Sequence, residues 1–335
     1  MTTIKDVAKT LNISITTVSR ALDGYSDVSA ETRQRVIDAA RIMGYSPNRA
    51  ARQLRKQKSE TIGFILPASA LRFDEPFFTE FVSGLGDSLS RNNYDLLVAN
   101  ATSDEQECYF YNRWINGHKV DGMVLNRLQV NDWRIKILTD ARFPFTTLGK
   151  TPDSKEYPHV LVDGSQAYLE LIQHLQAHGF TRIAFIGGPP RLINHQNQVQ
   201  WIKTAIQNCG LPFDPELILS AELNSSSGYS TASQLLELSK PPDAILCIND
   251  ETAFGTLSAA HAHGLNIGKE IAIAGFDGVH ESRFTEPPLT TLDIPLFDIA
   301  QLLADMLLEK INGNPLEVDE VTIHPNLLVR ASTGG

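Results

Sequence analysis

The chain has 335 residues, which is too long for a single compact core and enough for two or three domains. Its 42% hydrophobic and 20% charged residues are typical of a soluble globular protein, and no apolar run is long enough to span a bilayer. The N-terminal segment 2–6 lacks the apolar stretch of a secretory signal, so we expect a cytoplasmic protein without a membrane partner. The three cysteines have no metal-binding or redox spacing, and we expect no metal or cofactor.

The formal net charge of −10 is unevenly distributed along the chain. Residues 1–58 carry a net charge of +6, whereas the remainder carries −16. A basic head on an acidic body indicates that one domain meets a polyanion such as nucleic acid while the other avoids it.

The first 45 residues have the pattern of three short helices. Apolar residues at helical spacing mark the first of them: Ile4, Val7, Ala8 and Leu11. Asn12 is suited to a tight turn, Ser14 to the N-cap of a second helix that ends near Leu22, and Ser29 to the N-cap of a third. Gly44 is a suitable C-terminal stop. Helix, short turn, helix and supporting helix is the helix-turn-helix plan.

Residues 47–59 differ from the head that precedes them. Pro47 breaks the third helix, and the basic segment that follows has Leu54 as its one large apolar residue. A helix this short is not stable alone in water, so we expect it to form only on DNA.

From Thr61 onward, apolar strands alternate with amphipathic helices, a pattern typical of parallel sheets covered on both faces. The predicted strands are 62–66, 94–99, 122–125, 145–148, 160–162, 183–186, 218–221, 244–248, 271–275 and 327–329. The predicted helices are 76–92, 103–116, 131–141, 166–178, 193–209, 227–238, 251–263 and 294–312. Ligands bind at the carboxyl ends of the strands in such sheets, so two lobes of this kind can enclose a cleft for a small molecule.

The pattern therefore predicts an all-α helix-turn-helix head, a short linking segment and an α/β core of two doubly wound parallel-sheet lobes.

Several stretches, in order from end to end, resemble the lactose-repressor (LacI/GalR) family. In the head and hinge these are Thr3–Ala8, Thr17–Leu22, Val28–Arg33, Gly44–Asn48 and Ala51–Arg55; in the core they are Ile248–Asp250, Ala274–Asp277, Leu289–Leu292 and Val329–Thr333. The resemblance implies a sequence-specific transcriptional repressor that binds a near-palindromic operator as a homodimer. It also implies a hinge helix and a core like that of a periplasmic binding protein. We therefore expect a DNA-binding domain at 1–46, a hinge at 47–59 and an effector-binding and dimerisation domain at 60–335. Its lobes would comprise 60–160 plus 293–325, and 161–292 plus 326–335. The chain lacks a C-terminal heptad tail, so we expect no further tetramerisation helix.

By this resemblance the second helix enters the major groove, where Ile15 and Thr16 read bases with support from Arg20. Leu54 wedges into the minor groove. The full set of expected DNA contacts is Thr3, Lys5, Ser14, Ile15, Thr16, Thr17, Ser19, Arg20, Ser29, Thr32, Asn48, Arg49, Ala51, Arg52 and Leu54. Hydroxyl contacts to phosphate fix register, although Ser29 is equally suited to capping its helix. Asp23 stands where the family usually has Asn, and we expect no phosphate contact from it.

The resemblance also implies an effector site that contains Phe77, Phe78, Asp163, Gln198, Asn249, Asp277 and Leu296. We expect Phe78 to stack on a sugar ring and Asp277 to accept hydrogen bonds from its hydroxyls. A core role for both phenylalanines, and turn or cap chemistry for Asn249 and Asp163, are the alternatives.

Gln198 stands where the family often has a ligand-gripping Arg, which favours a neutral sugar over a charged effector. The segment 72–76 resembles that of α-glucoside-responsive members. The predicted function is a repressor with a neutral sugar as inducer. A purine-type effector, or a corepressor instead of an inducer, is the alternative. The sequence has no phosphate-binding loop, serine elbow or metal-spaced histidines, so we do not expect an enzyme.

Overall fold

The computed structural model describes residues 2–45, 58–66, 76–152 and 157–335. The chain divides into two compact units, residues 1–58 and 59–335, and each is a folded body in its own right. We call the first unit the head and the second the core.

The head contains the three predicted helices, α1 (Ile4–Leu11), α2 (Ile15–Leu22) and α3 (Ala30–Ile42). Their inward faces meet in a small core of Val7, Ala8, Val18, Ala21, Val28 and Val36. Asn12 ends α1 in the left-handed conformation with φ 54°, which lets the chain turn within three residues into α2. The helix-turn-helix prediction is confirmed.

The predicted hinge helix lies outside the described residues. Its expected DNA contacts therefore remain predictions from the sequence: Asn48, Arg49, Ala51, Arg52 and Leu54. Residues 72–75, which carry the α-glucoside cue, also lie outside the described residues.

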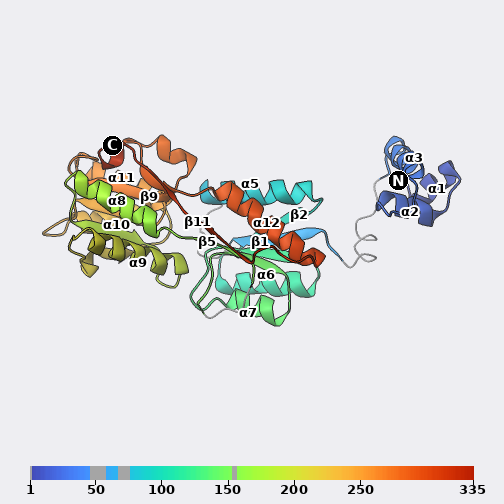
Figure 1. The fold of residues 1–335 in the computed structure, drawn as a ribbon, viewed down its shortest axis with the longest axis horizontal. Coiled ribbons are helices and arrows are strands. Elements are labelled where there is room, and N and C mark those ends of the chain that lie inside the picture. The colour runs from blue at the N-terminus through green and yellow to red at the C-terminus, as the bar shows by residue number, and fades with distance from the viewer. Residues whose placement is uncertain (1, 46–57, 67–75, 153–156) are drawn as a thin grey trace. The chain divides into compact units, whose positions relative to one another are not determined.

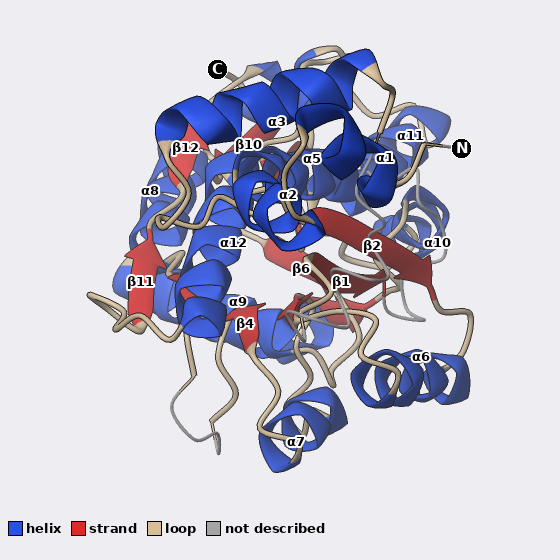
Figure 2. Cartoon of the chain, turned by 90° about the vertical axis from the view of Figure 1, so that its right-hand side faces the viewer, coloured by secondary structure: helices blue, strands red, loops and turns tan. Residues whose placement is uncertain are grey.

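The first lobe of the core is built on a six-stranded parallel sheet of order β11-β5-β4-β3-β1-β2. Its strands are β1 (Thr61–Leu66), β2 (Asp95–Asn100), β3 (Gly122–Leu125), β4 (Phe145–Leu148), β5 (His159–Val162) and β11 (Glu320–Ile323). The helices α5 (Pro76–Arg91) and α12 (Leu296–Asn312) pack together over one face, and α6 (Asp104–Asn116) and α7 (Trp133–Asp140) cover the other (Figures 1 and 2).

The second lobe has a six-stranded sheet of order β12-β10-β9-β8-β6-β7. Its strands are β6 (Ile183–Gly187), β7 (Ile218–Ser220), β8 (Ala244–Cys247), β9 (Ala272–Asp277), β10 (Thr290–Asp293) and β12 (Asn326–Leu328). The helices α8 (Ser165–Ala177) and α9 (Ile193–Asn208) pack as one pair, and α10 (Ser225–Leu236) and α11 (Asp250–Ala262) as another.

The described chain passes from one sheet to the other at 163–164, 294–295 and 324–325. Each lobe is therefore completed by a segment from the C-terminal part of the chain. Parallel strands end at the same edge of each sheet, so the connections that follow them gather where the lobes face each other. The predicted fold class is confirmed for the head and for the two-lobed core.

The sequence pattern does not predict the strands β10 and β11, and β12 runs antiparallel to its neighbour. The strand β11 is an edge strand of alternating half-buried and exposed residues, and β10 is four residues long and rich in threonine, so neither forms an apolar run. The strand β12 pairs antiparallel with β10: the chain leaves the second lobe after β10 and comes back into it from the first lobe after β11, so the two strands run in opposite directions.

Candidate functional site

The exposed side of α2 is the surface that the sequence predicts to contact bases. Ile15 is 44% exposed, and Thr16 and Lys5 are also exposed. Thr16 and Arg20 are one helical turn apart, so they lie on the same face of α2. This face presents the side chains that the sequence analysis expects to read bases.

The hydroxyl groups expected to contact phosphate are tied in pairs at the helix starts. Ser14 Oγ accepts a hydrogen bond from the Thr17 backbone N–H at 3.0 Å and lies 2.8 Å from the Thr17 hydroxyl. Ser29 repeats this arrangement with Thr32, whose backbone N–H donates to Ser29 Oγ at 3.2 Å. Ser14 and Ser29 therefore cap α2 and α3. Contact of the same hydroxyls with phosphate stays a prediction from the sequence.

Thr3 and Ser19 are engaged with carboxylates. The Thr3 hydroxyl and backbone N–H donate to Asp6 at 2.7 and 2.8 Å, and these hydrogen bonds lower the pKa of Asp6. The Ser19 hydroxyl donates to Asp23 at 3.4 Å. Both residues therefore have structural partners within the head.

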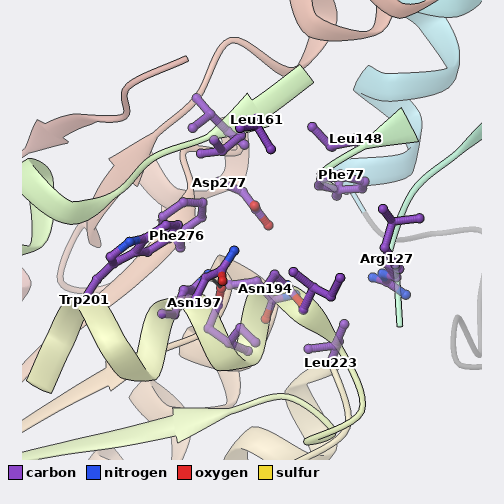
Figure 3. Close-up of a pocket in the computed structure, with 18 of the residues that line it drawn as sticks. Phe77, Arg127, Leu148, Leu161, Asn194, Asn197, Trp201, Leu223, Phe276 and Asp277 are labelled. Atoms are coloured by element: carbon purple, nitrogen blue, oxygen red, sulfur yellow. Dashed lines mark hydrogen bonds between the residues drawn. The ribbon is translucent and has the colours of Figure 1, made fainter. Parts of the chain in front are cut away.

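In the core, a cavity of about 140 Å³ lies between the ends of the strands of the two lobes (Figure 3). Phe77 at the start of α5, Arg127 after β3 and Lys150 after β4 come from the first lobe. Asn249 after β8 and Asp277 at the end of β9 come from the second. A space of this size holds several water molecules, each of which needs about 10–15 Å³, and so also a small ligand.

One face of α9 forms the polar wall of this cavity. Asn194, Asn197, Gln198 and Trp201 line it, at the i, i+3, i+4 and i+7 spacing that places four side chains on one side of a helix. Figure 3 shows Asn194 and Asn197 on this helix opposite Leu148 and Leu161, with Asp277 directed into the space between them. Apart from Gln198, these α9 residues were not predicted, although their helical spacing was readable in the sequence.

Asp277 lies on an unusual backbone. Its φ is 106°, a region that residues other than glycine rarely adopt, and Gly278 follows with φ 77°. The buried carboxylate of Asp250 accepts a hydrogen bond from the Val279 N–H at 2.9 Å and another from the Thr291 hydroxyl at 2.6 Å. Burial raises the pKa of Asp250 to about 7. The carboxylate thus anchors the loop that carries Asp277 to the start of α11.

Gln198 is 2% exposed, and its amide is held at both ends. Its Oε1 accepts from the Tyr168 hydroxyl at 2.7 Å, and its Nε2 donates to the Ile248 carbonyl at 3.2 Å. Asn249 caps α11, with its Oδ1 accepting from the backbone N–H and the hydroxyl of Thr252. Both amides line the cavity in orientations fixed by the protein.

Three of the expected effector residues do not line the cavity. Phe78 is fully buried in the core below the cavity wall, and its neighbour Phe77 lines the cavity instead, because successive side chains of a helix point about 100° apart. Leu296 is 1% exposed and packs in the same core, while Ile294 takes the place at the wall. Asp163 lies just before the N-cap residue Gly164 of α8, and its carboxylate accepts a hydrogen bond from the Ser165 N–H at 3.0 Å.

The charged groups at the wall are balanced. Lys150 forms an ion pair of 3.6 Å with Glu320, and the Arg127 guanidinium lies 4.6 Å from the centre of the Phe78 ring. The remaining charged side chains of the described cavity lining, Arg127 and Asp277, have opposite charges. Among the described residues, no group of histidine, cysteine and carboxylate side chains is arranged to hold a metal ion. No helix in the described part of the chain is long and apolar enough to cross a membrane.

Two family models match separate parts of the chain. Residues 3–48 match the model of bacterial regulatory proteins of the lacI family, and residues 172–333 match the periplasmic binding protein-like domain. These matches cover the helix-turn-helix head and much of the core.

Full-length relatives share the same organisation. The HTH-type transcriptional regulator AglR of Rhizobium meliloti is 32% identical over 99% of this chain and 94% of its own. The HTH-type transcriptional repressor CytR of Escherichia coli is 31% identical over 99% of this chain and 96% of its own.

Among solved structures, a complex of the transcriptional regulator CelR with cellobiose is 26% identical, with a TM-score of 0.76 over 99% of this chain and 100% of that one. The lac repressor dimer bound to operator has the same fold, with a TM-score of 0.84 at 24% identity over 99% of each chain. The chain belongs to the lacI family of bacterial transcriptional regulators. It is a DNA-binding repressor with an effector-binding core, not an enzyme.

Proposed function

We propose that a neutral sugar binds in the cavity between the lobes and acts as an inducer that lowers the affinity for operator DNA. The observation that carries the proposal is the composition of the cavity wall. Asn194, Asn197, Gln198 and Asn249 contribute uncharged amides, which both donate to and accept from hydroxyls. Asp277 adds one carboxylate acceptor, and Phe77, Trp201 and Phe276 add apolar faces for a ring.

The balance of charge favours a neutral ligand over a phosphorylated one. Lys150 has Glu320 as its ion-pair partner, and Arg127 is offset by Asp277. Gln198 stands at a buried position where an arginine would add a charge, and its amide is already held by Tyr168 and Ile248. The similar structure of CelR is a complex with cellobiose, which supports a saccharide in a core of this fold.

We infer that the repressor acts as a homodimer in the cytoplasm, with one head on each half of a near-palindromic operator. In this arrangement α2 lies in the major groove with Ile15, Thr16 and Arg20 at base edges. The hydroxyls of Thr3, Ser14, Thr17, Ser19, Ser29 and Thr32, together with Lys5, contact the phosphate backbone. An inducer that binds one arrangement of the lobes more tightly shifts the equilibrium away from the DNA-bound form.

The effector class can be tested by thermal-shift measurements on the full chain against neutral mono- and disaccharides, sugar phosphates and purines. A ligand that binds only the folded state raises the melting temperature with concentration. The proposal expects stabilisation by at least one neutral saccharide. Stabilisation by sugar phosphates or purines alone would overturn it in favour of a charged or planar effector.

A further inference from the structure

The guanidinium of Arg20 on α2 is held by a carboxylate from the loop that follows this helix. Arg20 Nε lies 3.2 Å from Asp27 Oδ1, and Arg20 Nη2 lies 2.6 Å from Asp27 Oδ2. Two parallel N–H···O contacts of this kind fix the plane of a guanidinium as well as its position. The ring of Tyr25 lies under the same group, with its centre 4.9 Å from Arg20 Cζ.

The loop that presents Asp27 is itself fixed to the head. The Tyr25 N–H donates to the Arg20 carbonyl at 3.1 Å, and the Val28 N–H donates to the Tyr25 carbonyl at 3.3 Å. Arg33 on α3 reaches back and donates to the Tyr25 carbonyl at 2.7 Å. The backbone on both sides of Asp27 is therefore held in place by the head, which presents its carboxylate to Arg20.

The bond pattern decides which part of Arg20 remains available to DNA. Asp27 occupies the edge formed by Nε and one N–H of Nη2. The opposite edge, formed by Nη1 and the other N–H of Nη2, carries two roughly parallel donors. Guanine presents two neighbouring acceptors in the major groove, N7 and O6, which this edge matches.

We propose that Asp27 is a specificity-determining residue, which aligns Arg20 so that it reads a guanine in each operator half-site. The inference rests on the proposed placement of α2 in the major groove. An Arg20 without this support would have to give up side-chain freedom on binding and would pair as readily with phosphates as with guanine. Asp27 therefore contributes to discrimination between sequences more than to overall affinity.

The stability of the head separates this role from a structural one. The two side chains are 43% and 53% exposed, and ion pairs this exposed contribute little to stability. Removal of the Asp27 carboxylate is therefore expected to leave the thermal unfolding of the full chain unchanged while it alters DNA recognition.

The test uses the full-length protein and an operator obtained by in vitro selection from random duplexes. Arg20→Ala, Asp27→Asn and Asp27→Ala are compared with Asp38→Asn, a control that removes the same charge from an exposed site on α3. Affinities for the selected operator and for each single base-pair variant are measured at one fixed salt concentration.

Arg20→Ala should reduce discrimination at one G·C pair per half-site by about five- to a hundredfold. Asp27→Ala and Asp27→Asn should relax the same pair about three- to tenfold, the alanine variant more. The Asp38→Asn control should keep the wild-type preference at that pair.

Three results would overturn the proposal. If the Asp27 variants keep the wild-type preference at that pair, Asp27 does not align Arg20. If the Asp27 variants bind the operator more tightly than Asp38→Asn does, Asp27 masks Arg20 instead of aligning it. If Arg20→Ala keeps the wild-type preference at every pair, Arg20 reads no base. All three results leave the proposed function intact, because the wild-type protein still selects an operator; failure of the wild type to select any sequence would instead refute the proposed function.

Discussion

The hydroxyl of Tyr168 on α8 donates a 2.7 Å hydrogen bond to the side-chain oxygen of Gln198 on α9. Tyr168 is almost completely buried, and burial raises its pKa well above the usual value, so this hydroxyl stays protonated. Gln198 thus joins the two helices behind the cavity wall. Its amide is uncharged and already oriented, so a ligand that binds it does not have to order a mobile side chain.

Replacement of Gln198 by alanine is expected to destabilise the core by about 1–3 kcal/mol, because the buried Tyr168 hydroxyl loses its acceptor. Urea-induced unfolding of the full chain measures this loss. Gln200→Ala, an exposed position on the same helix, is the matched control and should change stability by less than about 0.5 kcal/mol. Equal effects of the two substitutions would contradict a bracing role for Gln198.

Phe77 and Phe78 are expected to respond differently to substitution. Phe77→Ala removes an apolar face from the cavity and should weaken effector binding with a modest loss of stability. Phe78→Ala empties a fully buried site and should lower the unfolding free energy by about 3–5 kcal/mol. Calorimetric titration of both variants measures effector binding, and chemical denaturation measures stability. If folded Phe78→Ala lost more ligand affinity than Phe77→Ala, Phe78 and not Phe77 would be the residue that contacts the effector.

Asp277→Asn should lower the affinity for the neutral sugar by about ten- to a hundredfold, because hydrogen bonds to a charged acceptor are worth about 1.5–3 kcal/mol. Asp163→Asn provides the control, since Asp163 accepts a hydrogen bond at the start of α8 and does not line the cavity. Isothermal titration calorimetry with the stabilising saccharide gives both dissociation constants. A loss in the Asp163 variant that matches the loss in the Asp277 variant would place the site elsewhere.

The buried carboxyl of Asp250 makes the stability of the core depend on pH. Burial is the main cause that raises its pKa to about 7, opposed by the hydrogen bonds from Thr291 and Val279 and by the charge of Arg330. Because the folded-state pKa lies above the unfolded value, the protonated form stabilises the core at low pH, and this contribution is lost as the pH rises from about 4 to 7.

Asp250→Asn removes this titration while it keeps an amide that can accept from Val279. The stability of the variant relative to wild type should therefore rise between pH 5 and pH 8 by at most about 3 kcal/mol, because about two pK units of the titration fall within this range. Denaturation curves at several pH values measure the difference. A constant difference across this range would show that Asp250 does not titrate there.

The sequence was sufficient to predict the head, because capping residues and helical spacing are local signals. It also predicted most strands of the core, where apolar runs such as 183–187 leave little choice. The strands β10 and β11 carry no such run. The strand β11 also pairs with β5, which lies more than a hundred residues earlier in the sequence, so no local signal predicts this pairing.

The site was less predictable at the level of single residues. Phe77, Asp277, Asn249 and Gln198 line the cavity as expected, whereas Phe78 and Leu296 do not, and Ile294 lies at the wall instead of Leu296. A shift of one or two positions changes which side of a helix or connection faces the cavity, and the sequence pattern alone does not set that rotation. The Arg20–Asp27 pair depends on how the loop after α2 folds back, which no local signal fixes.

The most direct test of the account is the affinity of the full-length repressor for its selected operator, measured by fluorescence anisotropy with and without the saccharide that stabilises it. Coupling between two sites is reciprocal, so the account predicts that saturating saccharide weakens operator binding at least about tenfold and that operator weakens saccharide binding by the same factor. Asp277→Asn should bind operator normally but respond to the saccharide only at higher concentrations. An operator affinity that no neutral saccharide changes would contradict the account.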